Sequence, residues 1–163
     1  MDEWKRDRIA SAEQGENPTV LARMPSGFAV LGDTQFLPGY CLLLAVPRTE
    51  HLTDLPLDRR VEFLRDMAIL GEAVQLVCRP RRINYEIAGN IDSFVHAHVI
   101  PRYVWEPKGY LRGPAVLYPL EQRSVPEVQF SLEKHGSLMS SLTEQLGRLL
   151  ARLDILEADR SES

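Results

Sequence analysis

Residues 57–78, with the sequence LDRRVEFLRDMAILGEAVQLVC, are predicted to form one long amphipathic helix. Their apolar residues recur at steps of three or four, the spacing that places side chains on one face of a helix. The residues that make up this face are Leu57, Val61, Leu64, Ala68, Gly71, Val74 and Cys78. A helix with one apolar face must cover another apolar layer, so neighbouring segments have to supply that layer.

Strand-like segments lie on both sides of this helix in the sequence. Three short ones precede it, TVLARMP at 19–25, GFAVLG at 27–32 and GYCLLLAV at 39–46, and the first two are close enough to form a hairpin. Two more follow it, the alternating RRINYEIAG at 81–89 and the segment 94–100. The order helix, three strands, helix, two strands, loop and helix favours an α+β fold with an antiparallel sheet.

Both ends of the chain are predicted to be helical. Residues 2–14 read as a short charged helix, and the proline-rich residues 101–126 read as an irregular loop. A C-terminal helix is predicted over residues 127–156, before a disordered tail, EADRSES. Its apolar stripe consists of Leu138, Leu142, Leu146, Leu149, Leu150 and Leu153. We find no repeat and no break in composition, so a single domain over residues 1–163 is predicted.

Composition narrows the class of protein. A chain of 163 residues with 44% hydrophobic content is large enough for one globular core. Its net charge of -4 argues against binding to nucleic acid. The longest apolar run, Tyr40 to Val46, is too short to cross a membrane, and the charged start is no secretory signal. Cys41 and Cys78 lack a metal-like spacing, so a reduced, cytoplasmic protein is the simplest interpretation.

The segment FVHAHVIPR, residues 94–102, holds two of the four histidines. Side chains alternate between the faces of a strand, so one face carries Phe94, His96, His98 and Ile100. The other face carries Val95, Ala97 and Val99, which makes it the natural core side. The two imidazoles are then about 6–7 Å apart at Cα, and their face is expected to border a cleft.

Three interpretations of this histidine pair compete. Both histidines can be structural, with satisfied hydrogen bonds. They can share a zinc ion, which needs a third and usually a fourth ligand, from His51, His135 or an acid. They can also act on phosphorus, because a neutral imidazole is a competent nucleophile near neutral pH and a second imidazole can bind the phosphate oxygens.

The surroundings of the pair resemble a known family. INYEIAGN, five residues and then HAHVIPRY resemble the central signature of the histidine triad (HIT) family, in which a Gly-Gln or Gly-Asn turn leads into a strand with three alternating histidines. FLPGYCLLLAVP resembles the family's Pro-Gly-His strand, and HLTDLP leads into its long helix. The resemblance covers about residues 19–105. It implies a HIT-like sheet of about five strands with the long helix packed on it, to which the C-terminal helix is an extension.

The resemblance also implies roles for individual residues. His96 matches the histidine that attacks the phosphorus, and His98 matches the one that contacts the phosphate oxygens. Asn90 matches the turn amide that holds a phosphate or leaving-group oxygen. Phe94 stands where the first triad histidine is expected, so the triad is a dyad here. Tyr40 stands where many members have histidine, so it is a candidate nucleotide- or phosphate-binding residue, and its hydroxyl also makes it our candidate for orienting the His96 imidazole in place of the lost histidine.

Three further residues have two interpretations each. Asp33 matches an acid that binds the ribose hydroxyls, but beside Gly32 it is equally a turn former. Asn84 either reaches the phosphates or lies solvated at the edge of the sheet. Arg102 either binds phosphate or is an exposed arginine after a proline.

The predicted function is that of a nucleotide hydrolase or nucleotidyl transferase acting on nucleoside phosphoanhydrides or phosphoramidates, such as dinucleoside polyphosphates. One alternative is a nucleotide sensor that lost turnover with the first histidine. Another is a metal-binding protein that uses the histidine pair. The enzymatic interpretation requires no cofactor, although a divalent metal can accompany a polyphosphate. The expected partners are a nucleotide ligand and a second copy in a homodimer, since pairing would cover the edges of a five-stranded sheet.

Overall fold

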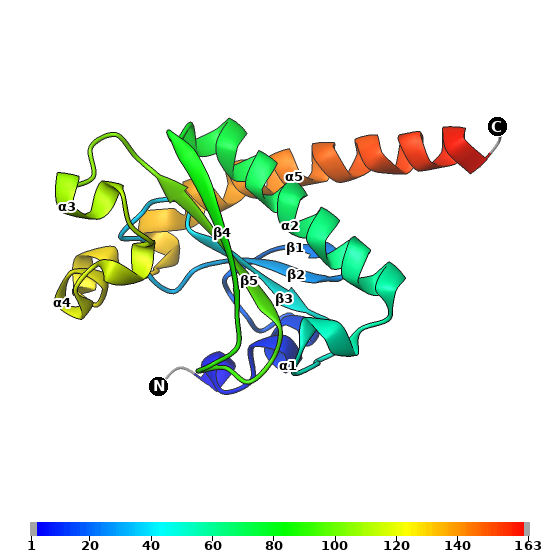
Figure 1. Cartoon of the computed structure of the whole chain (residues 1–163), viewed down its shortest axis with the longest axis horizontal. Helices are drawn as coiled ribbons and strands as arrows, with labels where there is room; N and C mark the ends of the chain where they lie inside the picture. The colour runs from blue at the N-terminus through cyan, green and yellow to red at the C-terminus, as the bar shows by residue number, and fades with distance from the viewer. Residues whose placement is uncertain (1–2, 162–163) are drawn as a thin grey trace.

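The computed structural model describes residues 3–161, apart from the side chains of 156, 157 and 159–161. Its centre is a five-stranded antiparallel sheet in the order β1-β2-β3-β5-β4 (Figure 1). The strands are β1 Val20–Met24, β2 Gly27–Leu31, β3 Cys41–Ala45, β4 Arg82–Ala88 and β5 His96–Arg102. The predicted α+β fold with about five antiparallel strands is confirmed, and so is the β1–β2 hairpin.

Strand β5 lies between β3 and β4, so the histidine pair occupies the interior of the sheet. His98 lies opposite Leu42 on β3 and opposite Glu86 on β4. The strand begins at His96, later than predicted, because the main-chain nitrogen of Phe94 bonds the carbonyl oxygen of Asp92 in a turn.

Helices α2 Leu57–Cys78 and α5 Leu132–Ser161 cover one face of the sheet, and α2 has the predicted bounds (Figure 1). They enclose a core that includes the predicted core side of β5. Its fully buried members include Leu43, Leu70, Val74, Ala97, Val99, Leu142 and Leu146. The predicted leucine stripe of the C-terminal helix is confirmed, because its remaining leucines pack against the same core.

The predicted contact face of α2 is largely wrong. Leu57, Val61 and Leu64 are 71%, 59% and 39% exposed, and the helix instead turns Phe63 and Leu70 toward the sheet. Asp66 explains the error, because its buried carboxylate lies on the sheet side and accepts hydrogen bonds from the main chain and hydroxyl of Ser26 at 2.8 and 2.6 Å. A pattern that counts aspartate as outward-facing selects the wrong face.

The predicted disorder after residue 156 is also wrong for the part described, because α5 continues as helix to Ser161. Its last turns project beyond the rest of the molecule (Figure 1). Among the described residues, no helix is both long and apolar enough to cross a membrane.

The opposite face of the sheet is covered by two segments, one that precedes the first strand in the sequence and one that follows the last. On the N-terminal side, a 3-10 turn at Glu3–Lys5 and α1 Arg8–Glu13 replace the single predicted helix, because Asp7 caps the start of α1. On the other side, residues 101–126 were predicted to be irregular, yet they contain two short helices. These are α3 Lys108–Leu111 and α4 Leu120–Arg123, with 3-10 turns at Ala115–Leu117 and Pro126–Val128; a further 3-10 turn, Leu52–Asp54, precedes α2.

Candidate active site at the histidine pair

His96 is held in one tautomer by the main chain. Its side chain is only 6% exposed, and Nδ1 lies 2.8 Å from the carbonyl oxygen of Phe94. A carbonyl oxygen only accepts hydrogen bonds, so Nδ1 carries the hydrogen and donates it. Nε2 therefore keeps its lone pair, which is the arrangement that a nucleophilic imidazole requires.

His98 is supported at Nδ1 by Tyr40. The tyrosine hydroxyl lies 2.6 Å from Nδ1 of His98. Burial raises the pKa of Tyr40, which keeps its hydroxyl protonated. Burial, together with the neighbouring His96, lowers the pKa of His98 to about 4, against a weaker opposite effect of Asp92. A neutral His98 that accepts from Tyr40 carries its own hydrogen on Nε2, where it is a donor for an anionic ligand.

Tyr40 was predicted to orient His96, and this is wrong. The register pairs Cys41 with Val99 and Leu42 with His98, so the residue just before β3 reaches His98 rather than His96. The two imidazoles lie side by side with ring centroids 4.9 Å apart and planes at 70°. Each histidine thus has its own hydrogen-bond partner at Nδ1, the Phe94 carbonyl oxygen for His96 and the Tyr40 hydroxyl for His98. This leaves the Nε2 atoms of both rings for a ligand.

Phe94 lies in an apolar cluster on the α1 side of the sheet. It is 5% exposed, contacts the His96 ring in a tilted arrangement with centroids 5.2 Å apart, and shares the cluster with Ile9 and Ala12 of α1 and with Phe28. An apolar side chain suits this position because α1 covers it. The support that Phe94 supplies to His96 comes from its carbonyl oxygen, and any residue at this position has one.

Two cavities border the dyad, and His96, His98 and Tyr40 line both. The smaller, about 190 Å³, is bounded by Arg8 of α1 and by Asp33. We call it the α1 cavity. The larger, about 390 Å³, is bounded by Asn90 and by Arg123 of α4, and we call it the α4 cavity. Ligand sites for small molecules usually have volumes of roughly 300–1,000 Å³, so the α4 cavity is the roomier candidate.

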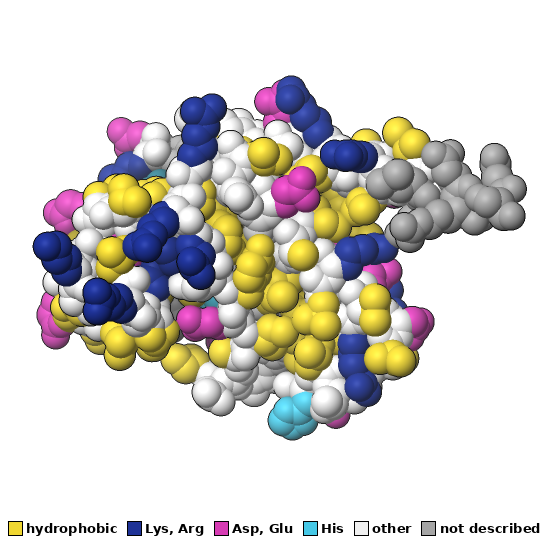
Figure 2. Space-filling view, turned by 45° about the horizontal axis from the view of Figure 1, so that its top comes forward, with side chains coloured by type: hydrophobic (Ala, Val, Ile, Leu, Met, Phe, Trp, Pro, Cys, Tyr) yellow, Lys and Arg dark blue, Asp and Glu magenta, His cyan; other side chains and the backbone are white. Residues whose placement is uncertain are grey.

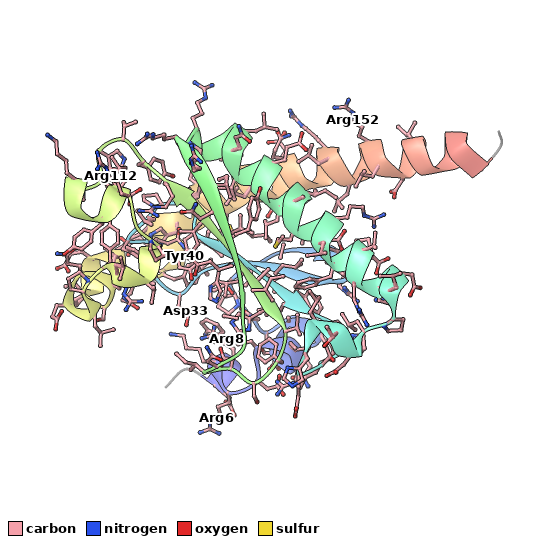
Figure 3. The ribbon with its side chains drawn as sticks, viewed as in Figure 1. Arg6, Arg8, Asp33, Tyr40, Arg112 and Arg152 are labelled. Atoms are coloured by element: carbon pink, nitrogen blue, oxygen red, sulfur yellow. The ribbon has the colours of Figure 1, made fainter. Side chains whose placement is uncertain are left out.

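Asp33 lies at the α1 cavity, but its carboxylate is engaged. Arg8 donates to both oxygens at 2.8 and 2.6 Å (Figure 3). In the same view Tyr40, Asp33 and Arg8 of α1 are labelled one below another. A ribose hydroxyl would have to share or displace the guanidinium. The sequence analysis missed Arg8, because a charged residue in a short terminal helix carries no signal for a site.

Asn84 and Arg102 were candidate phosphate ligands, but neither lines either cavity beside the dyad. Arg102 is 4% exposed, not exposed as one interpretation had it. Its guanidinium donates to Glu106, to Asn84 Oδ1 at 2.9 Å and to the carbonyl oxygens of Tyr110 and Gly113. These bonds use all its N–H groups, so Arg102 fastens the 103–113 segment to the sheet. This argues against a phosphate-binding role for either residue.

Among the described residues, no group of three or more His, Cys, Asp or Glu side chains is placed to hold a metal ion. His51, one of the candidate third ligands, is exposed before α2, and His135 lies on α5 against Phe130. The zinc interpretation therefore lacks further ligands in the part of the chain that the structure describes.

Comparisons with known proteins agree on the fold. No family profile matches the sequence, and no curated protein matches it. Among solved structures, a histidine triad protein from Marinobacter aquaeolei is 21% identical, with a TM-score of 0.68 over 88% of this chain and 95% of that one. The chain has the histidine triad fold.

Two other solved structures carry functional names. A hypothetical histidine triad nucleotide-binding protein from Sulfolobus tokodaii is 14% identical, with a TM-score of 0.65 over 86% of this chain and 91% of that one. A diadenosine triphosphate hydrolase from Plasmodium falciparum is 15% identical, with a TM-score of 0.52 over 83% of this chain and 76% of that one. At these identities the likeness concerns the fold.

Proposed function

We propose that the protein is a nucleotide-binding hydrolase or nucleotidyl transferase that cleaves nucleoside phosphoanhydrides or phosphoramidates at the α-phosphorus. The observation that carries this proposal is the separate support of the two dyad histidines at Nδ1, His96 by the Phe94 carbonyl oxygen and His98 by the Tyr40 hydroxyl. Nε2 of His96 then has a lone pair, and Nε2 of a His98 that accepts from Tyr40 has a hydrogen, on adjacent side chains that border the same two cavities.

In the first step, the lone pair of His96 Nε2 attacks the α-phosphorus. The P–N bond forms while the bond from phosphorus to the leaving group breaks, and its electron pair departs with the leaving group; a phosphate leaves as its anion, and the nitrogen of a phosphoramidate takes a proton from solvent and leaves as the amine. The imidazole ring gains positive charge, which the Phe94 carbonyl oxygen stabilises through the Nδ1 hydrogen bond. His98 Nε2 and the Asn90 amide donate to the phosphate oxygens as charge accumulates there.

In the second step, water or another acceptor hydroxyl attacks the same phosphorus. The P–N bond breaks, its electron pair returns to Nε2, and the proton of the attacking group is released to solvent. The products are the mononucleotide, or its ester, and the original tautomer of His96. These steps use groups of the protein and water; a divalent metal ion would enter bound to a polyphosphate substrate.

A trapping experiment tests this proposal. The protein is mixed with a dinucleoside polyphosphate or a nucleoside phosphoramidate, quenched within milliseconds to seconds, and analysed by peptide mass spectrometry. We expect released mononucleotide and a nucleotidyl adduct on the peptide that contains His96. Neither product from any substrate of the two classes would refute the enzymatic proposal.

The nucleotide sensor is the second candidate, and the Arg8–Asp33 pair favours it. The acid beside the α1 cavity is already neutralised by two hydrogen bonds, and α1 packs over Phe94. A protein of this kind would bind a nucleotide without turnover. Saturable nucleotide binding with no adduct and no product would select it over the enzyme.

We also propose a homodimer. Leu57, Val61 and Leu64 of α2 are exposed, and so are Tyr85 and Ile87 of the neighbouring edge strand β4, at 44% and 40%. Figure 2 shows hydrophobic side chains gathered across the middle of this side of the molecule. An apolar face beside an unpaired strand edge supports contact with a second copy. Light scattering at micromolar concentration should report a dimer, and Val61→Glu should give a monomer; a monomeric wild-type protein would refute this.

A further inference from the structure

Arg123 reaches the histidine dyad from outside the part of the sequence that resembles the HIT family. It is the last residue of α4, and its main chain is fixed in place. The Arg123 carbonyl oxygen accepts hydrogen bonds from the Thr34 hydroxyl at 2.7 Å and from the Gln129 amide at 3.0 Å. Thr34 also lines the α4 cavity, so these bonds hold α4 against the rim of the site.

The guanidinium of Arg123, a residue that lines this cavity, makes no hydrogen bond to the described residues. Its Nε is fully buried and has no hydrogen-bond partner among the described residues. Within the same part of the chain, no carboxylate lies within 4.0 Å of its nitrogens, although Glu86 and Asp92 also line the cavity. Leaving a buried donor unpaired costs about 1–3 kcal/mol, and more for a charged group, so the protein holds this uncompensated guanidinium beside the cavity at a cost in stability.

Arg8 offers the contrasting case. It borders the α1 cavity, but both of its terminal nitrogens already donate to Asp33. Of these two arginines beside the dyad, Arg8 is paired with a carboxylate, whereas among the described residues Arg123 is not. The charge of Arg123 also acts inside the site, since it opposes the effect of burial on the pKa of Tyr40.

We propose that Arg123 binds the phosphate of the departing group in the α4 cavity and so selects substrates with an anionic leaving group. This inference rests on the function proposed above and narrows it to phosphoanhydrides over phosphoramidates with a neutral amine. When the phosphoanhydride bond breaks, its electron pair remains on the departing phosphate oxygen. The planar guanidinium donates two hydrogen bonds to such a phosphate, and its charge offsets Glu86 and Asp92 in the same cavity.

The test compares two substrates that share the nucleotidyl group, a dinucleoside polyphosphate and a nucleoside phosphoramidate. Arg123→Gln keeps the main-chain contacts of α4 but removes the charge. Arg123→Lys keeps the positive charge but lacks the paired N–H donors of a guanidinium. For Arg123→Gln we expect kcat/KM to fall about 10- to 100-fold with the polyphosphate, the range for loss of a hydrogen bond to a charged group, and by less than about 3-fold with the phosphoramidate. Arg123→Lys should recover part of the loss.

Arg112→Gln is the matched control, because Arg112 lines a separate cleft of about 680 Å³ and lies apart from Tyr40 and Asp33 (Figure 3). Arg112→Gln should change kcat/KM by no more than about 2-fold with either substrate. An equal loss with both substrates in Arg123→Gln would assign Arg123 to the α-phosphate or to the fold, and no loss with either would remove it from the site. Both results overturn the inference.

If the wild-type protein turns over neither substrate, the proposed function fails. The role of Arg123 in phosphate binding is then tested separately, by measuring ligand affinities. Titration calorimetry then compares inorganic pyrophosphate with adenosine monophosphate. We expect Arg123→Gln to weaken pyrophosphate binding about 10-fold or more and adenosine monophosphate binding by less than about 3-fold. A wild-type protein that does not bind pyrophosphate, or a variant that binds it equally well, would overturn the inference.

Discussion

The two faces of the central sheet are covered in different ways. Toward α2 and α5, the segment 94–100, which contains most of β5, presents Val95, Ala97 and Val99 to a continuous apolar core. Toward α1 and α4 the same segment presents Phe94, His96, His98 and Ile100, and short elements from outside the sheet cover them. The first covering excludes water across the face. The second leaves two cavities at the histidines.

The difference shows how one strand serves both stability and chemistry. Alternation along β5 assigns successive residues to opposite faces, so the core can be packed without restricting the site. The long helices supply much of the buried apolar area, while the short elements supply charged groups at the cavity rims, Arg8 from α1 and Arg123 from α4. Changes on the two faces should therefore have separable effects.

His96→Ala should give the largest effect on the site face. Turnover should fall by at least about 1,000-fold, because the lone pair that attacks phosphorus is removed, while nucleotide affinity stays within about tenfold. Steady-state kinetics and titration calorimetry measure the two quantities. The exposed His51→Ala is the control and should keep full activity. Undiminished turnover in His96→Ala would show that His96 is not the nucleophile.

Leu43→Ala tests the core face. Leu43 is fully buried on β3 opposite Ala97, so its truncation should lower the free energy of unfolding by about 2–5 kcal/mol. The nucleotide affinity of the folded protein should stay close to that of the wild type, because the side chain points away from the dyad. Urea unfolding and calorimetry measure the two. A variant that keeps its stability but loses binding would contradict the separation of the faces.

Tyr40→Phe should have a smaller effect, on turnover alone. The variant keeps the ring but removes the hydroxyl that bonds His98 Nδ1, so His98 loses the contact that orients its imidazole. We expect kcat to fall about 10-fold, as when an orienting contact is lost at other histidine sites. Tyr103→Phe, which removes a hydroxyl outside both cavities, is the control. Equal values of kcat in Tyr40→Phe and Tyr103→Phe would show that the hydrogen bond between Tyr40 and His98 does not contribute to turnover.

The smallest expected effect is a pH dependence of stability. The pKa of His98 is lowered to about 4 from 6.5, so between these values the unfolded chain binds the proton and the folded protein does not. The free energy of unfolding should therefore decrease as the pH falls from about 6.5 to about 4 and stay constant, for this group, above that window. The charged groups that line the two cavities with His98 include Glu86 across the strand pair, Asp92, Arg123, Arg8 and Asp33.

Urea unfolding at about pH 7 and about pH 5 measures this dependence. His98→Gln should show a smaller decrease than the wild type, since glutamine does not titrate, and other carboxylates contribute equally to both proteins. His51→Gln should follow the wild type. An identical decrease in His98→Gln and the wild type would show that His98 does not titrate in this window.

The sequence by itself determined the order of the elements, the bounds of α2 and the two faces of β5. These features depend on local periodicity and turn residues, which act over a few positions. The resemblance around HAHVIPRY was likewise local and predicted the observed fold. Whether the residues it singles out carry the chemistry remains a prediction.

Only the tertiary structure decided which polar groups meet at the dyad and which face of α2 is buried. Arg8 and Arg123 are far apart in the sequence and lie in segments whose local pattern indicates no site, so only the packing of α1 and α4 brings them to the two cavities. Tyr40 supports His98 rather than His96 because of the β3–β5 register. The inward face of α2 depends on the buried Asp66–Ser26 contact. Each of these is a long-range contact, and its partner cannot be identified from the residue pattern within one element.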